Sequence, residues 1–61
     1  MALKIGDRVH YRVYPSGLPD MTTTGTVVGS SSGAYRVEWD DVDYTKGYEP
    51  SAYRAHDLDL A

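Results

Sequence analysis

The chain has 61 residues, which suits a single domain, and a domain of this size buries only about 60% of the surface that its unfolded form exposes. It has no cysteine, which excludes disulfides and thiolate metal sites and is usual in a reducing compartment. Its formal net charge of -3 disfavours non-specific binding to nucleic acid, whereas six tyrosines and one tryptophan suit partly exposed walls and binding surfaces.

The N-terminal residues form no apolar run as long as a signal peptide or a membrane span requires, so we expect a cytoplasmic protein. Residues 4–9 predict a lead-in, a tight turn at Gly6 and Asp7, and the start of a strand. Residues 8–14 alternate, which puts Val9, Tyr11 and Val13 on one face, with both valines in the core. The opposite, outer face would carry Arg8, His10, Arg12 and Tyr14.

Residues 15–20 contain two prolines and a glycine, which predicts a long loop rather than a central strand. Long loops on small barrels often make the contacts with a partner. The alternative is a plain solvated connection with Leu18 tucked beneath it. Residues 21–24 would then lead into the next strand.

Residues 25–41 predict a β-hairpin. Gly25 and Gly29 have the same parity as Val27 and leave room for a bent strand to pack closely, so Val27 rather than Val28 should face inward. Residues 30–33 form a four-residue loop in which Gly33 takes a positive φ. The alternation of residues 34–40 then turns three side chains inward, namely Tyr35, Val37 and Trp39.

The last third of the chain predicts three short elements. Residues 44–48 favour a weak strand. Residues 49–54 favour a single 3-10 turn that begins at Pro50, because proline suits the first position of a helical turn. Residues 56–60 close the chain as a final strand, with Leu58 and Leu60 inward and the intervening aspartates in water.

Five short strands, a long loop after the first and a 3-10 turn before the last resemble an SH3-like barrel, and we expect residues 1–61 to form one all-β domain of this kind. The segments KIGDRV, GTVVG, YRVEWDD and HDLDL are similar to the small KOW/Tudor-type barrels and to small uncharacterised bacterial and phage barrel proteins. These segments specify a turn, a hairpin and a closing strand, and therefore the fold rather than the function. Such relatives usually carry glycine after the WDD pair, where this chain has Val42.

The resemblance to Tudor-type barrels implies an aromatic cage that holds a methylated cation by cation–π attraction. The rings that could converge in such a cage are Trp39, Tyr44, Tyr48 and Tyr53. The alternative is that Trp39 and Tyr35 belong to the core and the other rings form a half-buried wall.

The arginines of the first and third strands could hold a nucleic-acid backbone, with Tyr14 stacking on a base. KOW-type relatives contact RNA or transcription partners in a similar way. The alternative is a solvated face that pairs with the nearby acids Glu38, Asp57 and Asp59.

Residues 40–43 cluster three aspartates but lack the spacing and the distal glutamate of a calcium loop, so they are interpreted as turn residues. His10 and His56 have no metal-ligand spacing. We interpret His10 as an exposed strand residue and His56 as a hydrogen-bonded residue that closes the last strand. Because no nucleophile motif or phosphate-binding glycine motif occurs either, we expect no enzyme, metal or cofactor.

The sequence therefore favours a non-enzymatic module that binds a partner protein or peptide. Its contacts would come from the 15–20 loop, the 40–43 turn and five outer residues, namely Tyr14, Leu18, Tyr44, Tyr48 and Tyr53. One alternative is a nucleic-acid-associated KOW-type module that uses Arg8, Arg12 and Arg36. Another is a subunit of a symmetric homo-oligomer whose interface is formed by the exposed tyrosines.

Overall fold

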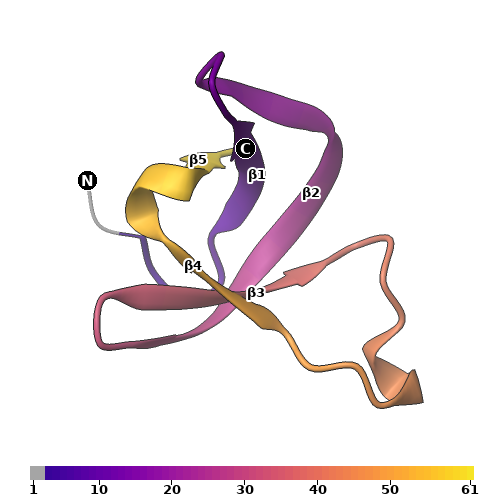
Figure 1. Cartoon of the computed structure of the whole chain (residues 1–61). Helices are drawn as coiled ribbons and strands as arrows, with labels where there is room; N and C mark the ends of the chain where they lie inside the picture. Colours follow the sequence, from indigo (N-terminus) through magenta and orange to yellow (C-terminus); the bar gives the residue numbers. More distant parts are fainter. Residues whose placement is uncertain (1–2) are drawn as a thin grey trace.

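A computed structural model describes residues 3–61 as one five-stranded antiparallel sheet in the order β4-β3-β2-β1-β5 (Figure 1). The strands are β1 (Arg8–Val13), β2 (Leu18–Ser31), β3 (Ala34–Trp39), β4 (Ser51–Arg54) and β5 (Leu58–Leu60). Two 3-10 turns, η1 (Tyr44–Lys46) and η2 (Ala55–Asp57), precede β4 and β5. The predicted all-β class and the five strands are confirmed. Within the described residues the sheet is open, with β4 and β5 as its edges.

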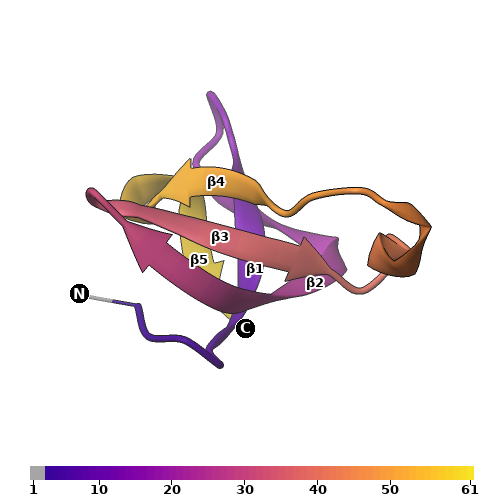
Figure 2. The ribbon, with the colours of Figure 1, turned by 90° about the horizontal axis from the view of Figure 1, so that it is seen from below.

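Strand β2 is long and bent, and it serves both halves of the sheet. Its first three residues pair with the end of β1, residues 24–26 pair with the start of β1, and six of its last seven residues pair with β3. His10 pairs with Thr24, but the next residue of β1, Tyr11, pairs with Asp20. Residues 21–23 therefore have no partner on β1, and β2 bends there. Figure 2 shows the result: β4, β3 and the second half of β2 lie side by side, and β1 and β5 cross them steeply.

The predicted loop over residues 15–20 is wrong in its second half, because β2 begins at Leu18. Val13, Arg12 and Tyr11 pair with Leu18, Pro19 and Asp20 in turn. Pro19 is tolerated because this part of β2 pairs with β1 alone, so its missing N–H leaves no gap in a second ladder. The connection is therefore limited to residues 14–17.

The hairpin between β2 and β3 is tighter than predicted and contains a bulge. Only Ser32 and Gly33 form the turn, both with positive φ (51° and 80°), as in a type I′ turn, so the expected positive φ at Gly33 is confirmed. Val28 is the extra residue of a bulge between Val27 and Gly29. Val27 is buried as expected, but the bulge pairs Gly29 with Arg36, which turns Gly29 away from the face that Gly25 occupies.

Among residues 3–61, the core consists of five buried apolar side chains, each from a different segment of the chain, namely Leu3, Val9, Val27, Val37 and Leu58. Tyr35 and Trp39 pack against this cluster, so the predicted inward face of β3 is confirmed. Two core predictions are wrong. Val13 is 42% exposed because it lies at the far end of the β1–β2 hairpin, and Leu60 is 45% exposed because it lies near the open edge formed by β5.

The elements predicted for residues 44–60 are displaced along the chain. Residues 44–46 form a 3-10 turn rather than a strand, because the Asp43 carboxylate caps it by accepting from the Thr45 N–H at 3.0 Å, and Gly47 ends it in the left-handed region. Residues 51–54 form β4, and Pro50 precedes this edge strand, where its missing N–H does no harm. The helical turn before the last strand exists, but as η2, and it takes His56 out of the predicted strand.

Candidate functional site

An open hollow of about 340 Å³ lies where β1, the first half of β2, β3 and β4 meet. The residues that line it are Tyr11, Asp20, Thr23, Trp39, Asp41 and Tyr53. Three of these are aromatic and two carry carboxylates, so we call it the aromatic-acidic hollow. Its volume is at the lower end of the range of small-ligand pockets, which suits one side chain better than a large molecule.

The aromatic side of the hollow is held rigidly. Tyr53 stands between Tyr11 and Trp39, with ring centroids 5.7 Å and 5.6 Å apart and interplanar angles of 63° and 80°. These are edge-to-face contacts, which aromatic quadrupoles favour. The Trp39 indole N–H donates to the Tyr53 hydroxyl at 3.2 Å, and the Trp39 backbone N–H donates to the Tyr44 hydroxyl at 2.9 Å. The indole is therefore fixed both by its ring and by its backbone.

The acidic side contains Asp20 from β2 and Asp41 from the turn after β3. Asp20 accepts hydrogen bonds from the Thr22 hydroxyl (2.7 Å) and backbone N–H (3.0 Å), and these bonds, the hydroxyl's first, hold the pKa of Asp20 below its ordinary value. The charge of nearby His10 lowers this pKa further. Asp20 is therefore ionised at neutral pH. Ring faces and carboxylates in one hollow attract the same kind of ligand group, a cation.

An exposed apolar pair continues the hollow toward the tip of the β1–β2 hairpin. Val13 pairs with Leu18, two residues beyond the pair of Tyr11 and Asp20. Since residues two apart on a strand share a face, Val13 and Leu18 stand on the same face as Tyr11 and Asp20. Leu18 is 67% exposed, so this apolar pair is open to a partner.

The five residues predicted to bind a partner are spread over the molecule. Tyr53 lines the hollow, Tyr44 supports Trp39 from outside it, and Leu18 lies on the adjoining apolar pair. Tyr14 belongs to another hollow, and Tyr48, 64% exposed, follows η1.

Tyr11 and Thr23 line this site without having been predicted from the sequence, whereas Asp20 belongs to the 15–20 segment that was predicted to contact a partner. Tyr11 was expected to face inward with Val9, and the structure places it on the predicted side but at the open end, 37% exposed. Asp20 was assigned to a loop, so its pairing with Tyr11 had no basis in the sequence. The alternation of β1 was the only signal available for Tyr11.

His10 is buried rather than exposed, at 8%. The register jump between His10 and Tyr11 folds residues 21–23 of β2 beside the ring, and His10 Nδ1 lies 3.2 Å from the Thr23 carbonyl oxygen. The histidine thus satisfies a backbone group at the bend that brings Asp20 and Thr23 to the hollow.

Two of the three arginines in the nucleic-acid alternative are engaged in ion pairs. Arg8 forms a two-pronged contact with Asp40, with one N···O distance of 3.1 Å, and this contact raises the pKa of Arg8 and holds that of Asp40 below its ordinary value. Arg12 bonds the Asp59 carboxylate and the Gly17 carbonyl. Such ion pairs are what the alternative to nucleic-acid binding predicts, namely a solvated face whose arginines pair with nearby acidic residues.

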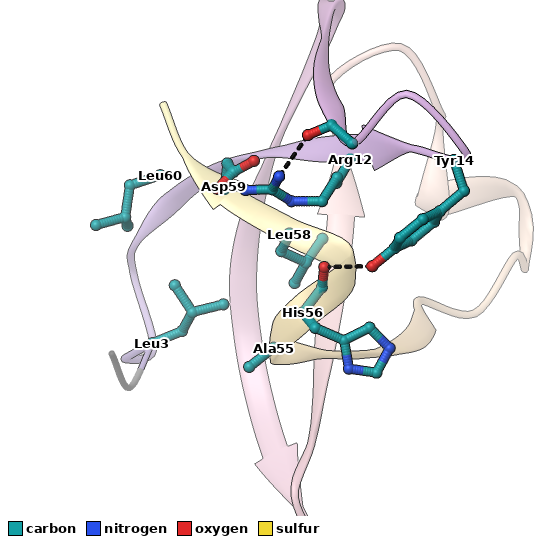
Figure 3. A pocket seen from close by; sticks show the side chains of 9 residues that line it. Leu3, Arg12, Tyr14, Ala55, His56, Leu58, Asp59 and Leu60 are labelled. Carbon is teal, nitrogen blue, oxygen red and sulfur yellow. Dashed lines mark hydrogen bonds and ion pairs between the residues drawn. The ribbon is translucent and has the colours of Figure 1, made fainter.

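A second hollow of about 470 Å³ lies beside β5 (Figure 3). Its lining combines leucines with polar groups and includes Leu3, Arg12, Tyr14, Gly17, Ala55, His56, Leu58, Asp59 and Leu60. Some of these polar groups are paired, since Arg12 bonds Asp59 Oδ1 and the Tyr14 hydroxyl donates to the His56 carbonyl at 2.8 Å, whereas Asp59 Oδ2 is buried and has no hydrogen-bond partner among the described residues.

Several other classes of feature do not occur in the described chain. Across residues 3–61, no three histidine or acidic side chains gather in a way that could hold a metal ion. In the same part of the chain, no helix has the length and apolar character needed to cross a bilayer.

No protein-family model, curated protein or solved structure matches this chain.

Proposed function

We propose that this chain is a non-enzymatic, SH3-like barrel module that binds a partner protein by taking a lysine or arginine side chain into the aromatic-acidic hollow. The observation that carries this proposal is the meeting of three mutually packed rings with two carboxylates in one open hollow. We keep the cytoplasm as its expected location.

The strand order supports the barrel. β2 is long enough to belong to two half-sheets, β1 pairs with both β2 and β5, and a 3-10 turn joins β4 to β5. Of the features on which the resemblance to KOW/Tudor-type barrels is based, the structure has the five strands and the 3-10 turn before the last strand, but not the long loop after the first. A closed or nearly closed sheet would also make good use of a core of only five buried side chains.

Electrostatics favours a cationic ligand. A cation over an aromatic face gains about 0.5–2 kcal/mol, depending on how far it is desolvated. Asp20 is ionised at neutral pH, and the net charge of -3 steers basic partners toward the molecule. The lining of tyrosine, tryptophan, threonine and aspartate contains no histidine, cysteine or lysine, which favours recognition over catalysis.

The apolar pair beside the hollow gives the partner a second point of contact. An extended segment that places its cation against Tyr53 can lay an apolar side chain on Val13 and Leu18. Two of the predicted contact residues, Leu18 and Tyr53, then belong to one surface.

The emission of Trp39, the only tryptophan, can report binding directly. We would titrate the protein with a short peptide of alternating lysine and leucine, and with a glutamate version of that peptide. The lysine peptide should shift the Trp39 emission, and the double variant Asp20→Asn with Asp41→Asn should bind it about tenfold more weakly. The matched control, Glu49→Gln with Asp57→Asn, removes the same two charges away from the hollow and should bind normally. Equal affinities for the two double variants would refute the proposal.

A homo-oligomer remains a second candidate, because three apolar side chains, Ile5, Leu18 and Met21, are each about two-thirds exposed beside a small core. Sedimentation at two concentrations tests it: a mass that rises with concentration favours assembly, and a constant monomer mass excludes it. The nucleic-acid alternative requires Arg8 and Arg12 to leave their acidic partners, so we rank it below both.

A further inference from the structure

The outer face of β2, β3 and β4 carries a patch of small residues flanked by two arginines. Arg36 pairs with Gly29 on one side and Ala52 on the other, and Ala34 pairs with Ser31 and with Arg54. Because paired residues share a face, these six residues lie together on the side opposite Tyr35 and Trp39. A shallow hollow of about 490 Å³ lies over the patch, lined by Gly29, Ser30, Ser31, Ala34, Arg36 and Ala52. We call this surface the arginine shelf.

The two arginines of the shelf differ from the other two in the chain. Arg8 and Arg12 each pair with an aspartate, whereas neither Arg36 nor Arg54 has a carboxylate within 4.0 Å among residues 3–61. Both are exposed. Arg36 and Arg54 are diagonal neighbours across β3 and β4, a spacing of about 7–8 Å at which long side chains act on the same ligand. An acidic protein thus holds a local cationic surface.

The shelf reaches the edge of the sheet. Within the described residues, β4 pairs only with β3, so alternate residues of β4 turn their backbone N–H and C=O groups away from the sheet. Ala52 is the β4 residue beside Arg36, and its methyl group leaves the Arg36 side chain free to extend toward this edge. A strand added at β4 would lie about 10 Å from β3, which an arginine and a glutamate side chain can span together.

We propose that β4 accepts an extended acidic segment of a partner protein as an added strand, with the carboxylates of that segment over Arg36 and Arg54. The backbone groups of the β4 edge would provide the ladder, and the two arginines would select the charge. Glu38 lies two residues from Arg36 on the same face, so the acidic residues should lie toward Arg54 rather than toward Glu38. This surface shares no residue with the aromatic-acidic hollow.

Charge decides between the possible occupants. A second copy that paired β4 against β4 would bring its own arginines close to Arg36 and Arg54, which like-charge repulsion opposes. Nucleic acid needs many phosphate contacts, and this chain has a net charge of -3 and two other arginines already paired. An acidic peptide needs only the two available cations and the free edge.

The experiment uses NMR and fluorescence anisotropy with a labelled peptide of alternating glutamate and valine. This peptide should shift the backbone amides of β4 and leave those of β5, at the opposite edge, unchanged. The variant Arg36→Gln with Arg54→Gln should weaken binding about tenfold, because each exposed ion pair contributes modestly. The matched control, Lys4→Gln with Lys46→Gln, removes the same charge elsewhere and should bind as the native chain does.

Three results would overturn the proposal. One is that the native chain does not bind the glutamate–valine peptide although circular dichroism shows that the chain is folded. Another is equal binding by the arginine and lysine double variants, which would mean that the charge of the shelf is not used. The third is tight binding of a single-stranded oligonucleotide at Arg36 and Arg54 with a steep salt dependence, which would assign the shelf to nucleic acid instead.

Discussion

Replacing Gly25 with alanine would insert a methyl group into the tightest contact around the core. A Cβ at Gly25 would lie 2.6 Å from Val37 Cγ1, 2.7 Å from Trp39 Cε3 and 3.0 Å from the Glu38 carbonyl oxygen. Val37 is fully buried, and Glu38 contributes backbone, so neither can move without shifting β3. The remaining neighbour, Trp39, is held by hydrogen bonds to two tyrosines.

The expected cost follows from this geometry. Overpacking a core typically costs 1–3 kcal/mol, and a contact that includes backbone belongs at the upper end, about 3 kcal/mol. Since about 1 kcal/mol shifts the melting temperature of a domain this small by about 4–8 °C, Gly25→Ala should melt about 12–24 °C lower. Because Trp39 must move, its emission should change in the folded state as well.

Gly29→Ala is the matched control, four positions along the same strand. Its added Cβ would meet Arg36 Cδ at 3.8 Å and Arg36 Cβ at 4.0 Å, which is ordinary contact, so this variant should be neutral or slightly more stable. Thermal and urea unfolding followed by circular dichroism would measure both. If the two variants differed by less than about 0.5 kcal/mol, within the usual range of surface substitutions, the packing of β2 on β3 described above would be wrong.

Ser32→Gly should raise stability by about 1 kcal/mol, because Ser32 has a φ of 51°, which costs L-residues free energy; a lower urea midpoint would count against the type I′ turn. Tyr53→Phe removes the acceptor of the Trp39 indole N–H and should cost about 1 kcal/mol in urea unfolding, whereas an unchanged midpoint would show that water replaces it fully. Hydrogen bonding to Arg8 favours the ionised carboxylate of Asp40 in the folded state, so its stabilising effect is complete above the unfolded pKa and is lost as pH falls through the lower folded pKa. Asp40→Asn should therefore be less stable than the native chain at pH 6 and equal to it at the acid end of the titration; a difference that persists there would contradict this assignment.

The sequence was informative where one signal dominated. The alternation of β3 predicted Tyr35, Val37 and Trp39 on the inner face, and the structure has Val37 fully buried with the two rings against it. The glycine at position 33 of the turn likewise predicts a positive φ, and the structure has a positive φ there. These two features follow from the strand period and from backbone sterics, which the local sequence determines.

Capping explains why residues 44–57 were misassigned. The prediction weighed strand propensity at Tyr44 and the proline at Pro50, but the Asp43 carboxylate and Gly47 fix a 3-10 turn between them. A cap is worth about 1 kcal/mol, which exceeds the propensity difference of a few weakly preferring residues. β4 then starts after Pro50, and the helical turn shifts to η2.

Register explains why the site itself could not be predicted. The aromatic-acidic hollow requires Asp20 to lie opposite Tyr11, and that pairing exists because residues 21–23 are omitted from the ladder with β1. A shift one residue earlier or later would move Asp20 to the other face. Three consecutive threonines carry no pattern that selects one shift over another, so the decision lies with packing around His10 and the core.

The two proposed surfaces lie on opposite faces of the same strands, because successive residues of a strand point to opposite sides. On β4, Tyr53 points to the rings of the hollow and Arg54 to the shelf; on β3, Trp39 and Arg36 divide in the same way. The two surfaces can therefore hold opposite charge preferences, because the carboxylates of Asp20 and Asp41 lie in the hollow and the guanidinium groups of Arg36 and Arg54 belong to the opposite face of the sheet. It follows that substitutions at Arg36 and Arg54 should leave lysine-peptide binding intact, and substitutions at Asp20 and Asp41 should leave glutamate-peptide binding intact. If either pair changed both affinities equally, the peptides would be sensing net charge rather than two separate surfaces.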